Sequence, residues 1–143
     1  MQPDATTDFR IPQPLVEELF AHARVCAPEE CCGLIGGEGN RAATVYPLRN
    51  IALHGEVAYE AAPEELFEAQ RCMRARGETL VGVYHSHPRS NDPAPSRTDV
   101  RLAFYPEAFY FIIGFDEGAC VLRAFCISER EGRWEPAPFS VEG

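Results

Sequence analysis

The stretch that most constrains the fold is an apolar run that leads directly into a histidine pair. Residues 79–84, Thr-Leu-Val-Gly-Val-Tyr, show no polar alternation, which is typical of a central strand buried on both faces. His-Ser-His-Pro follows at residues 85–88. Because side chains alternate along an extended chain, His85 and His87 point to the same side, and the proline then ends the strand. The sequence therefore predicts a sheet with polar chemistry at the end of its central strand.

A second motif, Ser-x-x-Asp, begins after seven further residues, with Ser96 and Asp99. It resembles a helix start, in which Ser96 is the N-cap and Asp99 lies in the first turn. It also supplies a carboxylate to the histidine pair, and the two interpretations are compatible because a capping serine fixes the helix end from which Asp99 would reach an ion. Two neutral imidazoles and one carboxylate suit Zn²⁺ and leave its fourth position for water. We therefore predict that His85, His87 and Asp99 are metal ligands.

A pair of glutamates lies upstream, in Pro-Glu-Glu-Cys-Cys-Gly-Leu-Ile at residues 28–35. A glutamate just before a strand is usually a solvated charge, and that explanation stays open for Glu30. A carboxylate beside a metal ion can instead take a proton from water and return it to a leaving amine. Glu30 is therefore the candidate general base, and Glu29 is its rival.

Three other residues with ligand chemistry are expected to lie outside the site. His22 falls on a predicted helix and His54 in a segment without clear periodicity, so both are predicted to be surface or packing residues. Asp92 lies among the prolines of residues 88–95, where a turn role is expected.

Composition limits the classes of partner and compartment. The 143 residues are predicted to form one domain, and the formal net charge of −9 argues against a nucleic-acid backbone as partner. No apolar run reaches the roughly 18 residues of a membrane span, and residues 1–5 lack a signal pattern, so we expect a cytoplasmic protein. The six cysteines are then expected to be free and mostly buried thiols, with a disulfide as the alternative.

Hydrophobic periodicity predicts an α/β fold, a mixed sheet with helices packed on it. Predicted helices cover 14–25, 63–77 and 97–104, and predicted strands cover 31–37, 42–48, 79–84, 108–115, 119–127 and a last one around 133–134. A short strand is expected near 56–59, within the ambiguous segment 51–61. In the second helix Leu66, Phe67 and Met73 are expected to face inward, and the aromatic residues expected in the core are Tyr84, Phe104, Tyr105, Phe109, Tyr110 and Phe111.

Taken together, these motifs resemble the signature of the JAMM (MPN-plus) metalloprotease family, in its minimal prokaryotic form. The signature consists of the tetrapeptide at 85–88, the Ser-x-x-Asp at 96–99 and the Glu-x-Cys-Gly-Leu-Ile at 30–35. The similarity spans about residues 12–127 and includes Pro-Leu-Arg-Asn at 47–50 and Gly-Val-Tyr at 82–84. Every ligand position is present, which argues against a metal-free relative.

The resemblance implies a cytidine-deaminase-like fold, a single domain with a mixed, curved sheet packed between helices. It implies Zn²⁺ bound by His85, His87, Asp99 and a water molecule. Glu30 would be the general base that activates this water, and Ser96 would stabilise the oxyanion.

Family members hydrolyse the bond after the C-terminal Gly-Gly of ubiquitin or a ubiquitin-like protein. Small prokaryotic members act on ubiquitin-like sulfur-carrier proteins or their conjugates, so the implied partner is such a protein. Only residues 105–107 separate the third helix from the next strand, so the insertion that eukaryotic relatives use to select a ubiquitin linkage is expected to be absent. The substrate tail is expected to lie along residues 51–61 as an added strand.

Alternative functions stay open. A RadC-like nucleic-acid-associated protein shares His-x-His-Pro and Ser-x-x-Asp, although the acidic charge and the lack of a helical DNA-binding domain disfavour it. A zinc nucleoside deaminase would need His-x-Glu together with Pro-Cys-x-x-Cys, and Pro-Cys-x-x-Cys does not occur. A third alternative is a non-catalytic interaction module that keeps zinc for stability.

Overall fold

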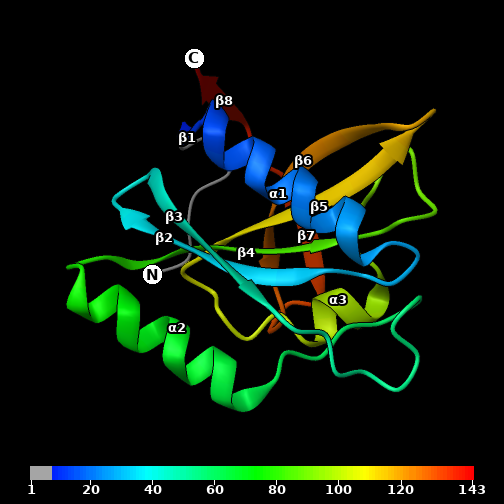
Figure 1. The fold of residues 1–143 in the computed structure, drawn as a ribbon, viewed down its shortest axis with the longest axis horizontal. Helices are drawn as coiled ribbons and strands as arrows, with labels where there is room; N and C mark the ends of the chain where they lie inside the picture. Colours follow the sequence, from blue (N-terminus) through cyan, green and yellow to red (C-terminus); the bar gives the residue numbers. More distant parts are fainter. Residues whose placement is uncertain (1–7) are drawn as a thin grey trace.

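A mixed sheet of eight strands organises residues 8–143, the part of the chain that this computed structural model describes. The strands are β1 (Phe9–Pro12), β2 (Cys32–Glu38), β3 (Arg41–Leu48), β4 (Thr79–Ser86), β5 (Phe109–Asp116), β6 (Ala119–Ser128), β7 (Arg133–Pro136) and β8 (Phe139–Glu142). Their order across the sheet is β7-β6-β5-β4-β2-β3-β1-β8. Three helices, α1 (Gln13–Cys26), α2 (Pro63–Ala75) and α3 (Arg97–Arg101), pack on this sheet (Figure 1).

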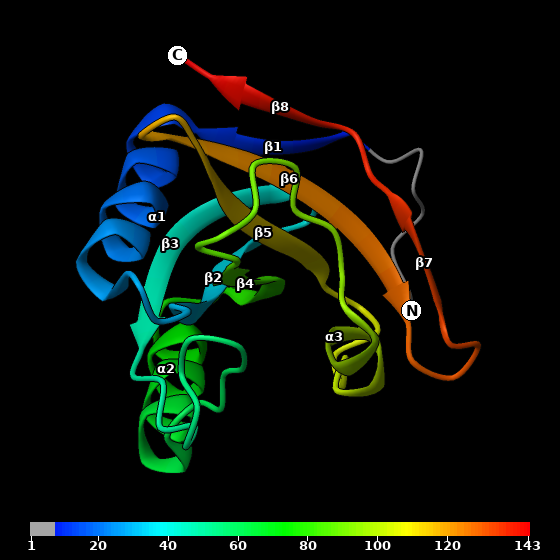
Figure 2. The same ribbon diagram turned by 90° about the vertical axis from the view of Figure 1, so that its right-hand side faces the viewer.

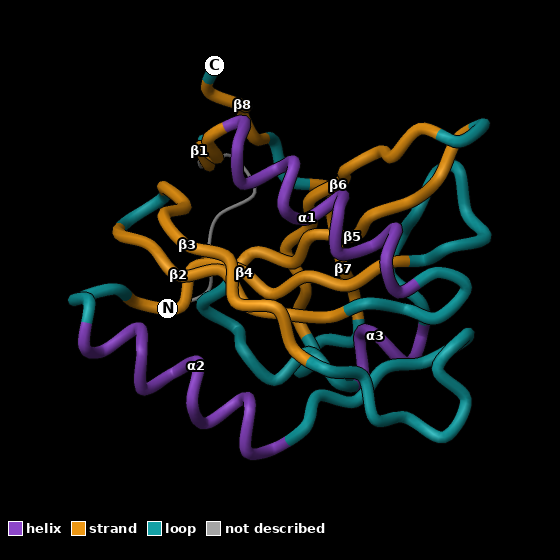
Figure 3. Tube along the Cα trace, viewed as in Figure 1, coloured by secondary structure: helices purple, strands orange, loops and turns teal. Residues whose placement is uncertain are grey.

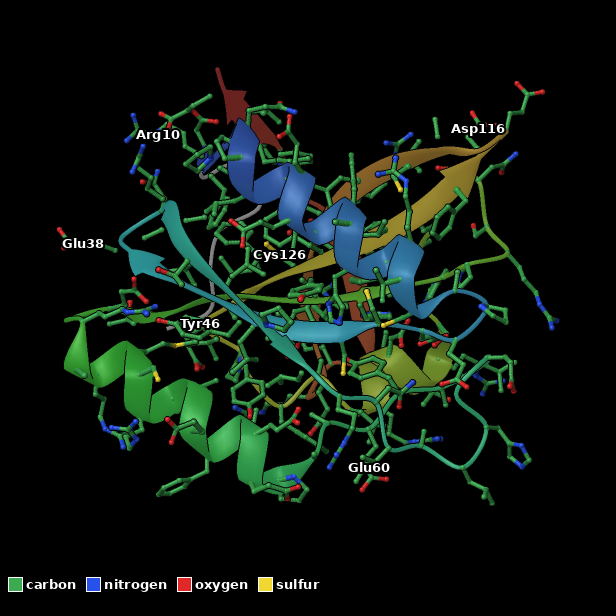
Figure 4. The ribbon with its side chains drawn as sticks, in the orientation of Figure 1. Arg10, Glu38, Tyr46, Glu60, Asp116 and Cys126 are labelled. Carbon is green, nitrogen blue, oxygen red and sulfur yellow. The ribbon has the colours of Figure 1, made fainter. Side chains whose placement is uncertain are left out.

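The sheet is strongly curved, and the helices cover both of its faces (Figure 2). Alternation along β5 builds the two cores: Phe109, Phe111 and Ile113 pack with α1, whereas Tyr110 and Ile112 face α2 and α3. Cys126 of β6 belongs to the α1 core, and Tyr46 of β3 belongs to the α2 core; both are labelled in Figure 4. The α/β fold with a mixed, curved sheet between helices is therefore confirmed.

Strand β4 is central, as its apolar sequence predicts. It pairs antiparallel with β2 and parallel with β5. It is longer than the predicted 79–84, because His85 and Ser86 pair with Ile112 and Ile113. The pairing continues beyond the strand, where the His87 N–H donates to the carbonyl of Ile113 at 2.8 Å. Both histidines thus sit on backbone that the sheet holds.

Gly33 of β2 leaves room for the ring of Tyr84, its paired residue in β4. A Cβ on Gly33 would lie 2.3 Å from the Tyr84 ring, closer than atoms can approach. The fully buried Tyr84 ring occupies this space on the α1 side of the sheet. The Tyr84 ring can therefore take this position only because residue 33 is a glycine.

Helix α1 spans almost the predicted 14–25, with a proline in its first turn and its apolar stripe buried against the sheet. Helix α2 begins at Pro63 as predicted and ends at Ala75, and Gly77 follows with a positive φ of 72°. The six cysteines form no disulfide within residues 8–143, and three of them are buried, fewer than the mostly buried set that was expected. In the part of the chain that the structure describes, no helix combines the length and the apolar character that crossing a membrane requires.

Several local predictions are wrong. Residues 56–59 form turns and loop rather than a strand (Figure 3), and only an isolated bridge between Asn50 and Ala61 pairs the ends of this loop. The predicted helix 97–104 ends at Arg101. Its capping box at Ser96 and Asp99 starts a helix that does not continue. Strands β1 and β8 were not predicted, because they pair with each other across the whole chain, Phe9 beside Phe139, and such contacts leave no local signal.

Two aromatic side chains expected in the core are exposed. Phe67 is 67% exposed because Ala69 and Met73 form the buried side of α2, and Phe67 lies off that stripe. Phe104 is 64% exposed because it follows the shortened α3 rather than lying on it. The other aromatic residues are at least partly buried, as expected: Tyr84, Tyr105, Phe109, Tyr110 and Phe111.

Candidate metal centre

The two histidines and the aspartate of the sequence motifs meet at one point. The Nε2 atoms of His85 and His87 lie 3.1 Å apart, and each lies 3.1 Å from Oδ2 of Asp99. Tetrahedral ligands with bonds of about 2.0–2.1 Å are separated by roughly 3.3 Å, so this triangle has nearly the dimensions of three zinc ligands. The residues present therefore fit a small divalent cation.

Two separate elements position these atoms. His85 lies at the end of β4 and His87 directly after it, and Asp99 comes from the first turn of α3. A capping box fixes Asp99: its N–H donates to Ser96 Oγ at 3.0 Å, and its Oδ2 accepts from the Ser96 N–H at 2.9 Å. The predicted N-cap and the predicted ligand position are thus both present in one short helix.

The loop between β4 and α3 is itself held against β5. The Phe115 N–H donates to the carbonyl of Ser90 at 2.8 Å. A Cβ on Gly114 would lie 2.5 Å from the same carbonyl and 2.7 Å from the ring of Pro93. Because Gly114 carries no side chain, the loop packs directly on the strand, and Pro93 is fully buried there. This packing holds the start of α3 close to the end of β4.

Burial keeps the donor atoms in the form that binds a cation. Burial lowers the pKa of the His85 imidazole, although Asp99 opposes the shift, so the ring is neutral. Burial alone would raise the pKa of Asp99, but hydrogen bonds with His85 and His87 outweigh it and hold that pKa well below its usual range. Nδ1 of His85 is buried without a hydrogen-bond partner among residues 8–143. Nε2 is the nitrogen of the His85 ring that faces His87 and Asp99.

Glu30 lies just before β2 and is 6% exposed, whereas its neighbour Glu29 is exposed. Burial raises the pKa of the Glu30 carboxyl to about 7, with His87 opposing the shift and Asp99 adding to it. The next two residues, Cys31 and Cys32, contact Ser86 and pair with His85, so the backbone of Glu30 lies beside the end of β4 that leads to the candidate ligands. Of the two glutamates, Glu30 therefore has the surroundings expected of a proton-transferring group.

Ser96 lies on the exposed rim of the centre. Its Oγ accepts the Asp99 N–H, which leaves the hydroxyl hydrogen free to donate. The other residues with ligand chemistry lie elsewhere, as expected. His22 packs against Tyr84, His54 is exposed, and Asp92 is an exposed loop residue whose N–H donates to Ser90 Oγ.

Three residues around the centre were not given a role from the sequence. Tyr59 stacks on His85, with ring centroids 4.6 Å apart. Ser86 points away from the centre, and its Oγ accepts the Cys31 N–H at 2.8 Å. The side chain of Asn50 bonds the backbone of Glu30. Only Asn50 carried a usable signal, because an asparagine just after a strand often organises the following loop.

A cavity of about 190 Å³ adjoins Tyr59 on the α2 side of the sheet. Its lining is mainly apolar and includes Leu66 of α2, Tyr110 of β5 and the exposed Phe104. The candidate metal centre therefore has an apolar hollow beside it, bounded by the loop before α2 and by the segment after α3.

A family model described as prokaryotic homologues of the JAB domain matches residues 12–126. The chain is 39% identical over 106 residues to the desampylase of Haloferax volcanii, covering 70% of this chain and 76% of that protein. It is 38% identical over 101 residues to the CysO-cysteine peptidase of Mycobacterium tuberculosis, covering 69% of this chain and 68% of that protein. It is 36% identical over 120 residues to the probable TtuB-protein conjugate cleaving protease of Thermus thermophilus, covering 83% of this chain and 76% of that protein.

Solved structures agree with these matches. A protein from Desulfitobacterium hafniense superposes with a TM-score of 0.81 at 33% identity, covering 94% of this chain and 92% of that one. A JAB1/MPN domain protein from Archaeoglobus fulgidus superposes with a TM-score of 0.59 at 17% identity, covering 94% of this chain and 99% of that one. At this identity the match supports the fold and nothing further. Because the family model spans most of the chain and its relatives are peptidases, the chain belongs to the prokaryotic JAB family and is an enzyme of the JAMM metalloprotease type.

Proposed function

We propose that this enzyme hydrolyses the peptide or isopeptide bond that follows the C-terminal Gly-Gly of a ubiquitin-like or sulfur-carrier protein. The observation that carries the proposal is the 3.1 Å triangle of His85, His87 and Asp99, with the buried Glu30 on the segment that leads into the strand paired with His85. The names of two relatives also support it. One is named for CysO joined to cysteine, and the other for conjugates of TtuB with proteins.

In this proposal His85, His87 and Asp99 hold Zn²⁺. When bound, the ion supplies a Lewis acid that polarises a water molecule and the carbonyl of the scissile bond. Glu30 takes a proton from the water as it attacks and later returns this proton to the leaving amine. Because Glu30 is buried, bulk water does not compete with the substrate for its carboxyl group.

Ser96 has the second chemical role. Its free hydroxyl hydrogen donates to the oxyanion that develops on the substrate carbonyl, and one such donor contributes about 3 kcal/mol to the transition state. The capping box gives this serine a defined position relative to Asp99. The donor and the candidate ligand therefore belong to one rigid turn.

The substrate tail would approach along the loop of residues 51–61. Leu53 and Val57 of this loop are 91% and 68% exposed, so they offer apolar contact to an incoming protein. A C-terminal Gly-Gly suits a narrow path to the centre because glycine has no side chain that would collide with the walls. We expect the reaction to take place in the cytoplasm, where the six cysteine thiols would stay reduced.

Replacement of Glu30 by glutamine tests the proposal. Glu30→Gln keeps the shape of the side chain and removes its ability to accept a proton, so hydrolysis should fall by about 10²–10⁴-fold. The substrate is a ubiquitin-like protein carrying an extension after Gly-Gly, and mass spectrometry identifies the new terminus. Zinc content and melting temperature should match those of the unmodified enzyme.

Glu29→Gln is the matched control, because it makes the same chemical change at the exposed neighbour and should leave the rate unchanged. Undiminished cleavage by Glu30→Gln would remove Glu30 from the mechanism. If the zinc-loaded enzyme itself releases no Gly-Gly terminus, the substrate class is wrong, and the alternatives of a nucleic-acid-associated protein or a zinc-stabilised interaction module regain their place.

A further inference from the structure

The side chain of Asn50 joins the segment that carries Glu30 to the loop of residues 51–60. Its Nδ2 donates to the backbone carbonyl of Glu30 at 3.0 Å and to that of Ala58 at 3.0 Å. A longer bond of 3.5 Å reaches the carbonyl of Gly55. One amide group thus donates hydrogen bonds to carbonyl oxygens in two separate parts of the chain.

The other end of the same amide organises the loop. Asn50 Oδ1 accepts the N–H of Ala52 at 2.9 Å and that of Glu60 at 3.0 Å. The ends of the loop are also closed by the N–H of Ile51, which donates to the carbonyl of Glu60 at 2.8 Å. Glu60 is labelled on this loop in Figure 4. The Asn50 side chain therefore fills the loop and holds it closed.

Glu30 depends on this loop because it lies outside the sheet. Strand β2 begins at Cys32, so no ladder hydrogen bond fixes Glu30. Its N–H donates instead to the carbonyl of Gly55 at 2.7 Å, and its carbonyl accepts from Asn50. Both backbone groups of Glu30 are therefore bound to the loop that Asn50 organises.

The same loop also reaches the candidate ligands. Tyr59, one residue from the Asn50-bound Glu60, stacks on His85 with the ring centroids 4.6 Å apart. A shift of the loop would thus move the backbone of Glu30 and the ring that packs on His85 together. Asn50 itself does not bond any of the three candidate ligands in the described structure.

We propose that Asn50 is a positioning residue, which sets the place of the Glu30 carboxyl relative to His87 and Asp99 by fastening the backbone of Glu30 to the loop. The inference rests on the proposed function, in which Glu30 transfers the proton. Misplacement of a reacting group by about 1 Å can lower a rate by about 10²-fold, so a loosened Glu30 should slow the chemical step. Substrate binding need not change to the same extent.

Asn50→Asp tests this inference with a change of few atoms. The acceptor oxygen for Ala52 and Glu60 is kept, but a carboxylate oxygen replaces the donor and faces the carbonyls of Glu30 and Ala58. The matched control is Asn40→Asp in the turn between β2 and β3, where the Asn40 amide donates to the Asp8 carbonyl. Amide hydrogen exchange at Glu30, zinc content, kcat and KM are measured on the zinc-loaded proteins.

We expect exchange of the Glu30 amide to accelerate by at least about ten-fold in Asn50→Asp, because the loop that protects it opens more often. We expect kcat to fall by at least about ten-fold while KM stays within about two-fold and zinc content stays unchanged. Asn40→Asp should behave as the unmodified enzyme. If Asn50→Asp does not fold, Asn50→Ser removes the donor bonds to Glu30 and Ala58, together with the acceptor bonds to Ala52 and Glu60, without adding charge, and it is judged by the same measurements.

Unchanged exchange at Glu30 would overturn the inference whatever the kinetics show. Faster exchange with an unchanged kcat, or a rise in KM alone, would also overturn it, because the loop would then serve only substrate docking. If the unmodified enzyme cleaves no Gly-Gly substrate, the proposed function has failed. The exchange measurement then still decides whether Asn50 fastens Glu30.

Discussion

Glu29 and Glu30 are chemically identical neighbours that receive different surroundings. Glu29 is exposed, whereas the Glu30 side chain is turned into the protein and its backbone is bound by the loop of residues 51–60. A carboxyl group gains proton-transfer chemistry near neutral pH mainly from such burial and from nearby charges. At the scale of the single residue, environment rather than identity separates the candidate base from its rival.

His22 provides a test of burial at the residue scale, away from the candidate ligands. Its Nδ1 lies 2.7 Å from the Tyr84 hydroxyl, and burial lowers its pKa from the usual value of 6.5. Above about pH 6.5 both the folded and the unfolded chain hold His22 neutral. As the pH falls below that value, the unfolded chain binds the proton first, so the folded state loses stability until the pH passes the lowered pKa.

The expected result is a pH-dependent stability difference between the unmodified enzyme and His22→Gln. The free energy of unfolding contributed by His22 should decrease from about pH 8 to about pH 5.5, as measured by urea denaturation. His54→Gln, the same change at an exposed histidine, is the matched control. A His22 contribution that grew on acidification would contradict the burial argument.

At the scale of elements, α3 is a helix whose cap matters more than its length. It has only five residues, yet its capping box binds Ser96 and Asp99 to each other in both directions. Substituting alanine for a capping serine typically costs about 1 kcal/mol, whereas glycine costs only a few tenths. Because glycine keeps the helix start and lacks the hydroxyl, it separates the structural role of Ser96 from its proposed chemical role.

We therefore expect Ser96→Gly to lower kcat/KM by about 10²–10³-fold while the free energy of unfolding changes by only a few tenths of a kcal/mol. Ser96→Ala should lose a similar amount of activity and about 1 kcal/mol of stability in addition. Denaturation curves and initial rates, with zinc content as a check on Asp99, give both quantities. Full activity of Ser96→Gly would show that the serine acts only as a helix cap.

At the scale of the whole molecule, the candidate metal centre joins parts that are far apart in the sequence. The end of β4 and the residue after it supply His85 and His87, α3 supplies Asp99, and the segment before β2 supplies the candidate base Glu30. An ion held by the two histidines and Asp99 would bind the folded chain and not the unfolded one. Such a ligand stabilises the fold by an amount that depends on its concentration relative to its dissociation constant.

We expect zinc at a hundredfold excess over its dissociation constant to raise the free energy of unfolding by about 2.7 kcal/mol, and a chelator to reverse the rise. His87→Ala should abolish most of this effect, whereas His54→Ala, at an exposed histidine outside the centre, should keep it. Thermal unfolding with and without zinc measures the shift. An equal shift in the two variants would place the ion elsewhere.

The sequence by itself determined the class of fold and the three candidate ligands. Central strand β4 was predictable because a strand buried on both faces must be apolar throughout. The pairing of His85 with His87 was predictable because alternation along a strand is a local property. Asp99 was predictable because a capping motif is encoded within four neighbouring residues. All of these signals act over short distances in the chain.

Only the tertiary structure decided how distant segments meet. The pairing of β1 with β8, the exposure of Phe67 and Phe104, and the irregular loop of residues 51–60 depend on contacts that no local pattern encodes. The fastening of Glu30 by Asn50 is of the same kind, because it joins backbone groups from two separate segments. Such contacts follow from how the curved sheet packs as a whole, and they decide which of two adjacent glutamates lies in the neighbourhood of the candidate metal centre.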